Sequence, residues 1–366
     1  MQDVLVIGGG PAGLATAIAA RLKGLGVTVI DARKPPIDKP CGEGLLPGAV
    51  EALRQLGVEL DSKLLFRFSG FHFVDENSSA CAEIPAGEAF GVRRTVFHRL
   101  LVDRALRLDV NFLWGTRLLS LDARGAETSA GFIPSRWIVG ADGSSSLVRR
   151  LAGLELRPRA PVRFGFRRHF EIAPWTNCVE VHWGDKSQLI LTPTGASEIC
   201  ISLFTSDPRL RLGRALEAFP AVARRIAGVQ PTSAEAGAAT MLRRARGVTR
   251  GNIGLAGDAS CTVDGIAGQG LSLAFQQALE LAGALAHGDL SGYAAAHARI
   301  VRIPVRVTRL LLAMSASRVI RRKALRLFAA NAALFSKMIS VHTGASSPDA
   351  LNATVMLNLG WRVILA

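Results

Sequence analysis

The stretch DVLVIGGGPAGLATAIAARLKGLGVTVID, residues 3–31, decides the fold of this chain. Its pattern predicts a buried strand over residues 3–7, a glycine-rich turn, a helix from about Pro11 to Leu25, and a second buried strand over residues 27–31. A strand, a helix and a second strand within about thirty residues are typical of a βαβ unit with parallel strands. We therefore expect the α/β fold class, with this unit at its N-terminal end.

The turn of this unit matches the pattern GxGxxG. Gly8 permits the tight turn, Gly10 lets a pyrophosphate approach the backbone, and Gly13 lets the helix pack closely on the strand. Pro11 and Ala12 begin the helix, whose free amides and partial positive charge suit phosphate groups. The turn predicts a dinucleotide site, and a purely structural glycine-rich turn is the alternative.

Asp31 ends the second strand of the unit. At this place a carboxylate accepts hydrogen bonds from ribose hydroxyls. We expect Ala32 and Arg33, directly after it, to lie against the same cofactor.

Two later segments, WIVGADGSSSLVR at residues 137–149 and GNIGLAGDA at residues 251–259, each predict a strand that runs into a turn. One carboxylate lies in each turn, Asp142 in the first and Asp258 in the second. Ligands of open α/β sheets bind at the carboxyl ends of the strands. Both aspartates are therefore candidate cofactor residues.

These three motifs, in this order, resemble those of the p-hydroxybenzoate hydroxylase-type FAD-dependent oxidoreductases over roughly residues 1–290. That group includes aromatic hydroxylases, geranylgeranyl reductases and flavin-dependent halogenases. The resemblance implies non-covalent FAD, with Asp31 on the adenosine ribose, Asp142 near the pyrophosphate and Asp258 on the ribityl chain. It also implies that Arg94 contacts the cofactor, whereas a solvated surface position is the alternative.

The segment KPCGEGL, residues 39–45, resembles the KPCGGGL-type sequence of the geranylgeranyl reductases. In that group it lies beside the isoalloxazine ring, which implies that Cys41 and Gly42 lie near the flavin. Cys41 is a candidate proton donor, and a small buried residue is an equally good interpretation. Glu43 replaces a glycine and is either a polar site residue or a solvated turn residue. Cys41 and Glu43 are the two catalytic candidates in the sequence.

The segment VDGIAGQGLS, residues 263–272, resembles the corresponding region of the hydroxylases at Gly268, Gln269 and Gly270. Its glycines would let the backbone approach the flavin ring, and a helix predicted over residues 270–287 would point its N-terminus at the ring. That placement would stabilise a reduced, anionic flavin. Glycine replaces the usual proline at position 265 and serine the usual asparagine at position 272, which disfavours an ordinary phenol hydroxylase.

The rest of the chain predicts a second, mostly antiparallel sheet and C-terminal helices. Alternation over residues 66–91 and a strand meander over residues 160–205 indicate the sheet, and a helix is expected over residues 210–227. The expected regions are a Rossmann-like FAD-binding domain from residues 1–66, 92–155 and 246–295, an inserted substrate domain from residues 67–91 and 156–245, and a C-terminal helical region over residues 296–366.

Charge is uneven along the chain, which has 44 basic and 29 acidic residues among 366 and a net charge of +15. Between Asp289 and Asp349 no acidic residue occurs, while arginines alternate with apolar residues at helical spacing. The simplest interpretation is amphipathic helices packed on the FAD domain with solvated arginines. The alternative is peripheral contact with an anionic membrane that admits a lipophilic substrate. Nucleic-acid binding is disfavoured, because no recognition motif accompanies the charge.

The five cysteines are scattered without a CxxC and the seven histidines lack ligand spacing, so neither a disulfide framework nor a metal site is expected. The first strand lacks the charged flank and cleavage site of a signal peptide, and no apolar run of about eighteen residues predicts a membrane span. We expect a cytoplasmic protein, with contact to the inner face of the membrane as the finer hypothesis.

The function that best fits these observations is an NAD(P)H-dependent FAD monooxygenase acting on a lipophilic aromatic or polyketide-type substrate. The Cys41 segment favours an alternative, a geranylgeranyl reductase-like enzyme that reduces an isoprenoid or other C=C double bond. A non-catalytic, flavin-bound maturation or binding protein is the third hypothesis. The tryptophan-rich segment of the halogenases is missing, which disfavours halogenation.

Overall fold

The N-terminal βαβ unit forms as predicted in the computed structural model, which describes residues 2–156 and 161–347. Strand β1 (Gln2–Ile7) is followed by helix α1 (Pro11–Leu22) and strand β2 (Val27–Asp31), and the two strands pair in parallel. The helix ends earlier than expected, because Gly24 adopts φ +82°, a left-handed conformation that closes helices.

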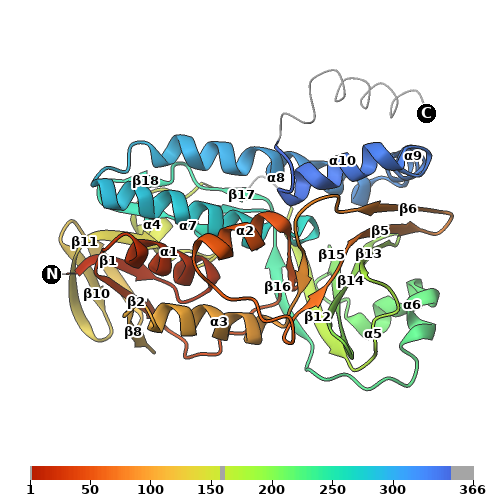
Figure 1. The fold of residues 1–366 in the computed structure, drawn as a ribbon, viewed down its shortest axis with the longest axis horizontal. Helices are drawn as coiled ribbons and strands as arrows, with labels where there is room; N and C mark the ends of the chain where they lie inside the picture. Colours follow the sequence, from red (N-terminus) through yellow and green to blue (C-terminus); the bar gives the residue numbers. More distant parts are fainter. Residues whose placement is uncertain (1, 157–160, 348–366) are drawn as a thin grey trace.

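The first sheet joins segments that lie far apart in the chain, as Figure 1 shows. Its strand order is β18-β19-β11-β1-β2-β8, and β10 and β9 extend it from β11. Because β1 pairs in parallel with β2 and β11, and β11 in parallel with β19, the turns after these strands meet at one edge. The other strands are β8 (Asn111–Trp114), β9 (Leu118–Asp122), β10 (Gly125–Thr128), β11 (Gly131–Gly140), β18 (Thr249–Arg250) and β19 (Ile253–Leu255).

The second sheet has the order β16-β12-β15-β14-β13-β5-β6 and is antiparallel except for the pair β13–β5. Its strands are β5 (Gly70–Asp75), β6 (Ser78–Glu83), β12 (Arg163–Phe170), β13 (Cys178–Trp183), β14 (Ser187–Gly195), β15 (Glu198–Thr205) and β16 (Ala236–Thr240). The α/β class and the mostly antiparallel second sheet are therefore confirmed. The boundaries expected for the three regions stay a prediction.

The single helix expected over residues 210–227 is wrong, because the segment is broken in the middle. The structure has two short α-helices there, α5 (Leu212–Ala215) and α6 (Pro220–Arg225), and a 3₁₀ turn at Leu216–Ala218 follows α5. Proline lacks an amide hydrogen and crowds the residue before it, so Phe219 takes φ −131° and ψ 65° instead of helical values.

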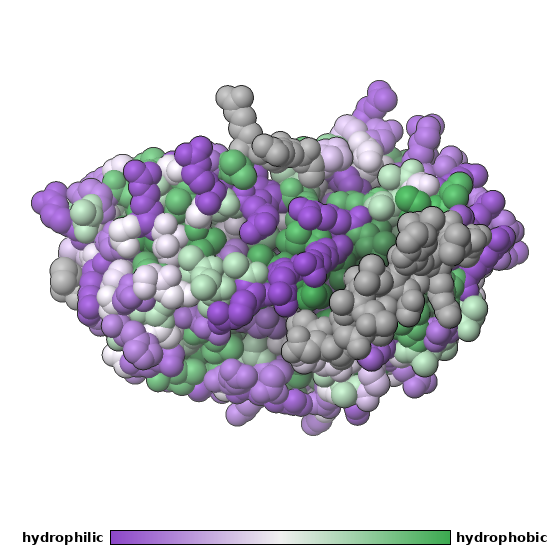
Figure 2. Space-filling model, turned by 90° about the horizontal axis from the view of Figure 1, so that it is seen from above, coloured by the Kyte–Doolittle hydropathy of each residue, from purple (hydrophilic) through white to green (hydrophobic). Residues whose placement is uncertain are grey.

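Of the three C-terminal helices, α8 (Tyr293–Ala316) runs along α7 (Gly270–His287), whereas α9 (Arg318–Ala330) and α10 (Ala332–Thr343) cover the end of the second sheet at β6. Met314 and Phe335 share a buried core cluster with Phe73 and Ala80 of the sheet. The expectation that these helices pack on the FAD domain is therefore incomplete, because α9 and α10 pack on β6. Figure 2, seen from above, shows a recess of hydrophobic residues bordered by hydrophilic side chains.

No single helix within the described ranges is long and apolar enough to cross a membrane. Helices α9 and α10 taken together are long and apolar enough, by length and composition alone. They bend by 109° at the break between them.

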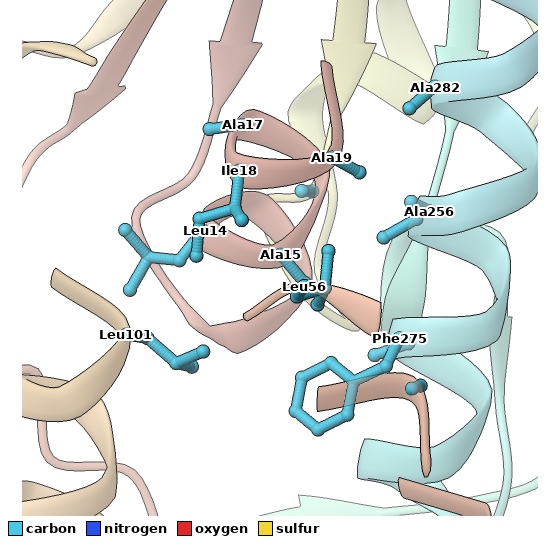
Figure 3. Packing of buried hydrophobic residues seen from close by; sticks show 14 of the residues in the cluster. Leu14, Ala15, Ala17, Ile18, Ala19, Leu56, Leu101, Ala256, Phe275 and Ala282 are labelled. Atoms are coloured by element: carbon cyan, nitrogen blue, oxygen red, sulfur yellow. The ribbon is translucent and has the colours of Figure 1, made fainter. Parts of the chain in front are cut away.

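Small residues bring α1 close to α7 (Gly270–His287), which forms over the predicted residues. Figure 3 shows Ala19 of α1 facing Ala282 of α7, Ala15 beside Leu56, and the Phe275 ring extending toward Leu101. This core fixes the N-terminal ends of α1 and α7 at one place. The remaining elements are α2 (Pro47–Gln55), α3 (Arg94–Leu106), α4 (Leu147–Leu151), β3 (Gly44–Leu45), β4 (Phe66–Arg67), β7 (Phe90–Gly91), β17 (Arg243–Arg244) and β20 (Cys261–Thr262).

Candidate active site

One cavity of about 780 Å³ is lined by residues of both sheets and of the C-terminal helices. All but one of the predicted cofactor residues line it. They are Gly8, Gly10, Pro11, Ala12, Asp31, Ala32, Arg33, Cys41, Gly42, Arg94, Asp142, Asp258, Gly268, Gln269 and Gly270. Gly13 lies behind the wall, because a Cβ there would be 1.8 Å from the Gly8 carbonyl oxygen. The structure therefore brings these separate motifs to one place.

The glycine-rich turn is held by contacts that leave its cavity side open. Gly8 has φ +113°, and a Cβ on it would lie 2.4 Å from the Ala141 carbonyl oxygen. Nε2 of the buried His98 lies 2.9 Å from the Gly9 carbonyl oxygen, and burial lowers the pKa of His98. The neutral imidazole therefore donates to that carbonyl and steadies the turn. Nothing in the sequence singles out His98, because a lone histidine in a helix carries no motif.

The three predicted carboxylates all have protein partners. The Asp31 carboxylate accepts from the amides of Gly9 and Arg33, both at 2.8 Å, so it also braces the glycine-rich turn. Asp258 accepts from Lys39 Nζ at 2.9 Å. Both Asp31 and Asp258 also line the cavity.

Asp142 has a structural role that the sequence did not reveal. Its Oδ2 accepts from the amides of Leu147 at 2.6 Å and Val148 at 3.1 Å, which stabilises the start of α4. Its Oδ1 is buried and has no hydrogen-bond partner in the described part of the chain.

Several backbone positions on the wall have no protein neighbour. A Cβ built on Gly10, Gly42, Gly268 or Gly270 would meet no atom within 4 Å. Arg94 is only 9% exposed, and its guanidinium has no hydrogen bond or ion pair among residues 2–156 and 161–347. Open backbone, two helix N-termini and a buried arginine without a partner fit a dinucleotide that carries a planar ring system.

The loop that carries Gln269 is tied to the C-terminal helix α10. The Gln269 side-chain amide donates to the His342 carbonyl oxygen, and His342 Nε2 lies 2.9 Å from the Ala267 carbonyl oxygen. Burial lowers the pKa of His342 to about 4, so the neutral ring donates to Ala267. The Gln269 side chain therefore ties its loop to α10. His342 also lines the cavity, and no sequence motif points to it.

The other end of the cavity is apolar and aromatic. Phe73 lies between Trp183 and Phe335, with ring centroids 6.3 and 5.1 Å away, and Phe328 stacks on Phe335 at 4.5 Å. Leu310 of α8 lines the same cavity and is 37% exposed, which places it at an opening to the surface.

The two catalytic candidates differ in their surroundings. Cys41 is a partly buried free thiol on the cavity wall. Glu43 is buried, so the interpretation as a solvated turn residue is wrong. Its Oε2 lies 2.6 Å from His169 Nε2, and its Oε1 accepts from the Arg94 amide at 3.0 Å.

Comparison with known proteins agrees with this geometry. A family model described as an FAD binding domain matches residues 1–185, half of the chain. The chain belongs to this FAD-binding family. FAD is therefore its cofactor, and the resemblance to the p-hydroxybenzoate hydroxylase-type oxidoreductases is confirmed.

Three relatives from the curated proteins carry different names. A rifampicin monooxygenase of Rhodococcus hoagii is 29% identical over 168 residues, which are 43% of this chain and 35% of that protein. A menaquinone reductase of Mycolicibacterium smegmatis is 32% identical over 169 residues, 41% of this chain and 40% of the relative. A dialkyldecalin synthase of Streptomyces rugosporus is 27% identical over 307 residues, 78% of this chain and 65% of the relative. The chain thus spans 35% to 65% of the length of these relatives.

A solved structure extends the likeness to the whole fold. A flavoprotein/dehydrogenase from Cytophaga hutchinsonii superposes with a TM-score of 0.85 at 18% identity, covering 100% of this chain and 98% of that one. At this identity the likeness concerns the fold.

Proposed function

We propose that this FAD-dependent chain is an NAD(P)H-dependent monooxygenase that hydroxylates a lipophilic aromatic or polyketide-type substrate. The observation that carries the proposal is one continuous cavity, which joins the glycine-lined cofactor end to the aromatic end beneath α8–α10. FAD reduced by a nicotinamide supplies the activation of O₂ when it is bound. The chain itself supplies an apolar compartment that binds the substrate and excludes water.

The cofactor contacts of the individual residues belong to the same proposal. Asp31 binds the adenosine ribose, Gly10 and the N-terminus of α1 bind the pyrophosphate, and Asp258 binds the ribityl chain. Arg94 is supported as a further contact by its buried guanidinium without a protein partner. Asp142 acts indirectly, by holding the turn before α4.

Turnover with isotopically labelled O₂ tests the reaction type. The FAD-loaded protein is supplied with NADPH or NADH and a panel of long-chain phenols and naphthols under ¹⁸O₂. A monooxygenase places one labelled oxygen atom in the product and forms no product without O₂. Product formed at an equal rate under anaerobic conditions would overturn the proposal.

A reductase of C=C double bonds is the second candidate, favoured by the half-buried Cys41 thiol on the cavity wall. The likeness to a menaquinone reductase supports it. Anaerobic turnover of a polyprenyl quinone or isoprenoid with deuterium transfer from the reduced cofactor would favour this candidate. The variant C41S would then lose reduction while keeping FAD.

We further propose that the face of α8 and α9 binds an anionic membrane surface. Helices α8–α10 contain no acidic residue. Seven of their basic side chains have no ion pair among the described residues: Arg299, Arg302, Arg306, Arg309, Arg322, Arg326 and Lys337. Val319 and Ile320 are exposed on α9, and the exposed Leu310 opens onto the cavity. Charge and exposed apolar side chains at a cavity opening together suit a lipid surface.

Vesicle co-sedimentation tests this surface. The triple variant R302E/R306E/R309E should bind vesicles of phosphatidylcholine and phosphatidylglycerol on the order of a hundredfold more weakly, at about 1 kcal/mol per basic residue. The control R209E/R214E/R224E makes the same charge change near α5 and α6, at the opposite edge in Figure 1, and should bind normally. Equal binding of both variants, or stronger binding to duplex DNA than to vesicles, would contradict the proposal.

A further inference from the structure

Glu43 has an unusual backbone conformation for a glutamate. It takes φ +59° between two glycines, and it forms part of the cavity wall with a side chain that is buried from solvent. Glycine adopts this left-handed region without steric cost, whereas a side chain there is disfavoured. The similar reductase sequence has glycine at this place. A strained and buried carboxylate is retained only where its contacts compensate for its cost.

The Glu43 carboxylate joins three separate parts of the chain. Oε2 accepts from His169 Nε2 at 2.6 Å, and Oε1 accepts from the Arg94 amide at 3.0 Å. Arg167 Nε lies 3.8 Å from Oε1 as an ion pair. His169 and Arg167 belong to β12, while Arg94 begins α3. The carboxylate thus connects the loop of residues 41–44 and the first turn of α3 to the second sheet.

The partners of Glu43 are themselves held in place. Arg167 also binds Asp38, and its Nη1 lies 3.2 Å from His169 Nδ1. His169 Nδ1 lies 2.9 Å from Ser233 Oγ. This arrangement leaves little freedom to the ring of His169 or to the guanidinium of Arg167.

A metal site is the other interpretation of this cluster. Donor atoms of Glu43, His169 and Cys200 lie within 4.8 Å of one another. The Arg167 guanidinium beside them repels a cation, and burial raises the pKa of the Cys200 thiol, which keeps it protonated. The Glu43 carboxylate already has three hydrogen-bonding or charged partners, so the geometry favours a clamp over a metal site.

We propose that Glu43 is a positioning residue that clamps the loop of residues 41–44 and the first turn of α3 onto the second sheet, and that its negative charge sets the reduction potential of bound FAD. The proposal depends on the proposed function only in that FAD fills the glycine-lined end of the cavity. A fixed negative charge near a flavin disfavours its anionic reduced form. Removal of this charge should therefore make the potential more positive.

Two variants separate the charge from the backbone. E43Q keeps the size of the side chain and removes the charge, and its single amide oxygen can still accept one of the two hydrogen bonds of the carboxylate. E43G removes the whole clamp and leaves a residue that suits φ +59°. The control E127Q makes the same chemical change at an exposed position on β10. The readouts are the dissociation constant of FAD and the midpoint potential of the bound flavin, measured against a reference dye without any substrate.

E43Q should shift the reduction equilibrium at least tenfold toward reduced flavin, which is about 30 mV for a two-electron couple. E43G should show a shift of the same sign and bind FAD at least tenfold more weakly, while E127Q should match the wild type. Wild-type potential and FAD affinity in both variants, or a potential that becomes more negative, would overturn the proposal. H169N interrupts the clamp from the sheet side, so its effect on FAD affinity must be non-additive with that of E43G, and additive effects of these two variants would also overturn the proposal.

These results are independent of the reaction type. If wild-type protein binds FAD but shows no oxygen-dependent turnover, the proposed function fails and the effects at Glu43 remain measurable. If wild-type turnover is oxygen-dependent and the Glu43 variants match it in potential and affinity, only the clamp is refuted.

Discussion

The two ends of the cavity are built in different ways. At the cofactor end, backbone surrounds the open space, and glycines leave room that no protein atom fills. At the aromatic end, which is the proposed substrate end, aromatic and aliphatic side chains from β5, β13 and the C-terminal helices form the wall. A wall of backbone depends on a few positions close together in the sequence, whereas a wall of side chains depends on packing across the whole chain.

The substrate end should be the more sensitive to truncation of one large side chain. Phe335 is 2% exposed and stacks on Phe328. F335A should lower the free energy of unfolding by ~3–5 kcal/mol, because the cavity that it leaves cannot collapse fully. Urea unfolding measures this effect. L310A, at the exposed opening, is the control, and a loss in L310A as large as that in F335A would contradict the assigned burial.

At the cofactor end, two neighbouring glycines should give opposite results. A Cβ on Gly13 overlaps the Gly8 carbonyl oxygen, so G13A should lower the free energy of unfolding by about 3 kcal/mol or more. A Cβ on Gly10 meets no protein atom, so G10A should unfold like the wild type and yet lose FAD affinity by at least about a hundredfold, or ~2.7 kcal/mol. Thermal unfolding and FAD titration separate the two effects. Normal FAD binding by G10A would show that no pyrophosphate lies against this turn.

The contact of His342 with the Ala267 carbonyl oxygen, which ties α10 to the loop of Gln269, should make the free energy of unfolding depend on pH. Burial lowers the pKa of His342 to about 4, whereas the unfolded chain titrates near the usual value of about 6.5. The stability due to neutral His342 is complete above about pH 6.5 and is lost as the pH falls toward 4. Between pH 7.5 and 5 the loss should be about 2 kcal/mol, and H342N should not show this part of it. Urea unfolding at the two pH values tests this, and an unchanged pH dependence in H342N would exclude His342 as the cause.

Arg94 should affect binding without affecting stability. Its guanidinium has no partner in the described ranges, so R94M should unfold like the wild type and bind FAD about tenfold more weakly, or ~1.4 kcal/mol. Arg93 is the matched control, because its guanidinium pairs with Glu198 at 2.6 Å and R93M should mainly change stability. Unchanged FAD affinity in R94M would remove Arg94 from the site.

Most residues that line the glycine-rich end of the cavity could be selected from the sequence, because their signals are local. The glycines at positions 8, 10 and 13 and the strand-to-turn segments near Asp142 and Asp258 each follow from a few adjacent residues, and parallel pairing brings them to one edge. The bonds of Asp142 to the start of α4 could not be predicted, since they depend on the geometry of a turn.

The substrate end and the clamp were not predictable in the same way. His342, His169 and Ser233 reach their partners from segments far away in the chain, and no sequence spacing records those contacts. The break at Pro220 was readable, since proline carries a local signal, and it was missed because apolar spacing on both sides suggested one helix.

FAD titration of the flavin-free protein, followed by flavin fluorescence and absorbance, tests the central claim most directly. The account predicts saturation at one FAD per chain for the wild type, and folded G10A that does not saturate in the same range. Folded wild-type protein that takes up no FAD, or wild type and G10A that bind it equally well, would contradict the assignment of the glycine-lined end as the cofactor site.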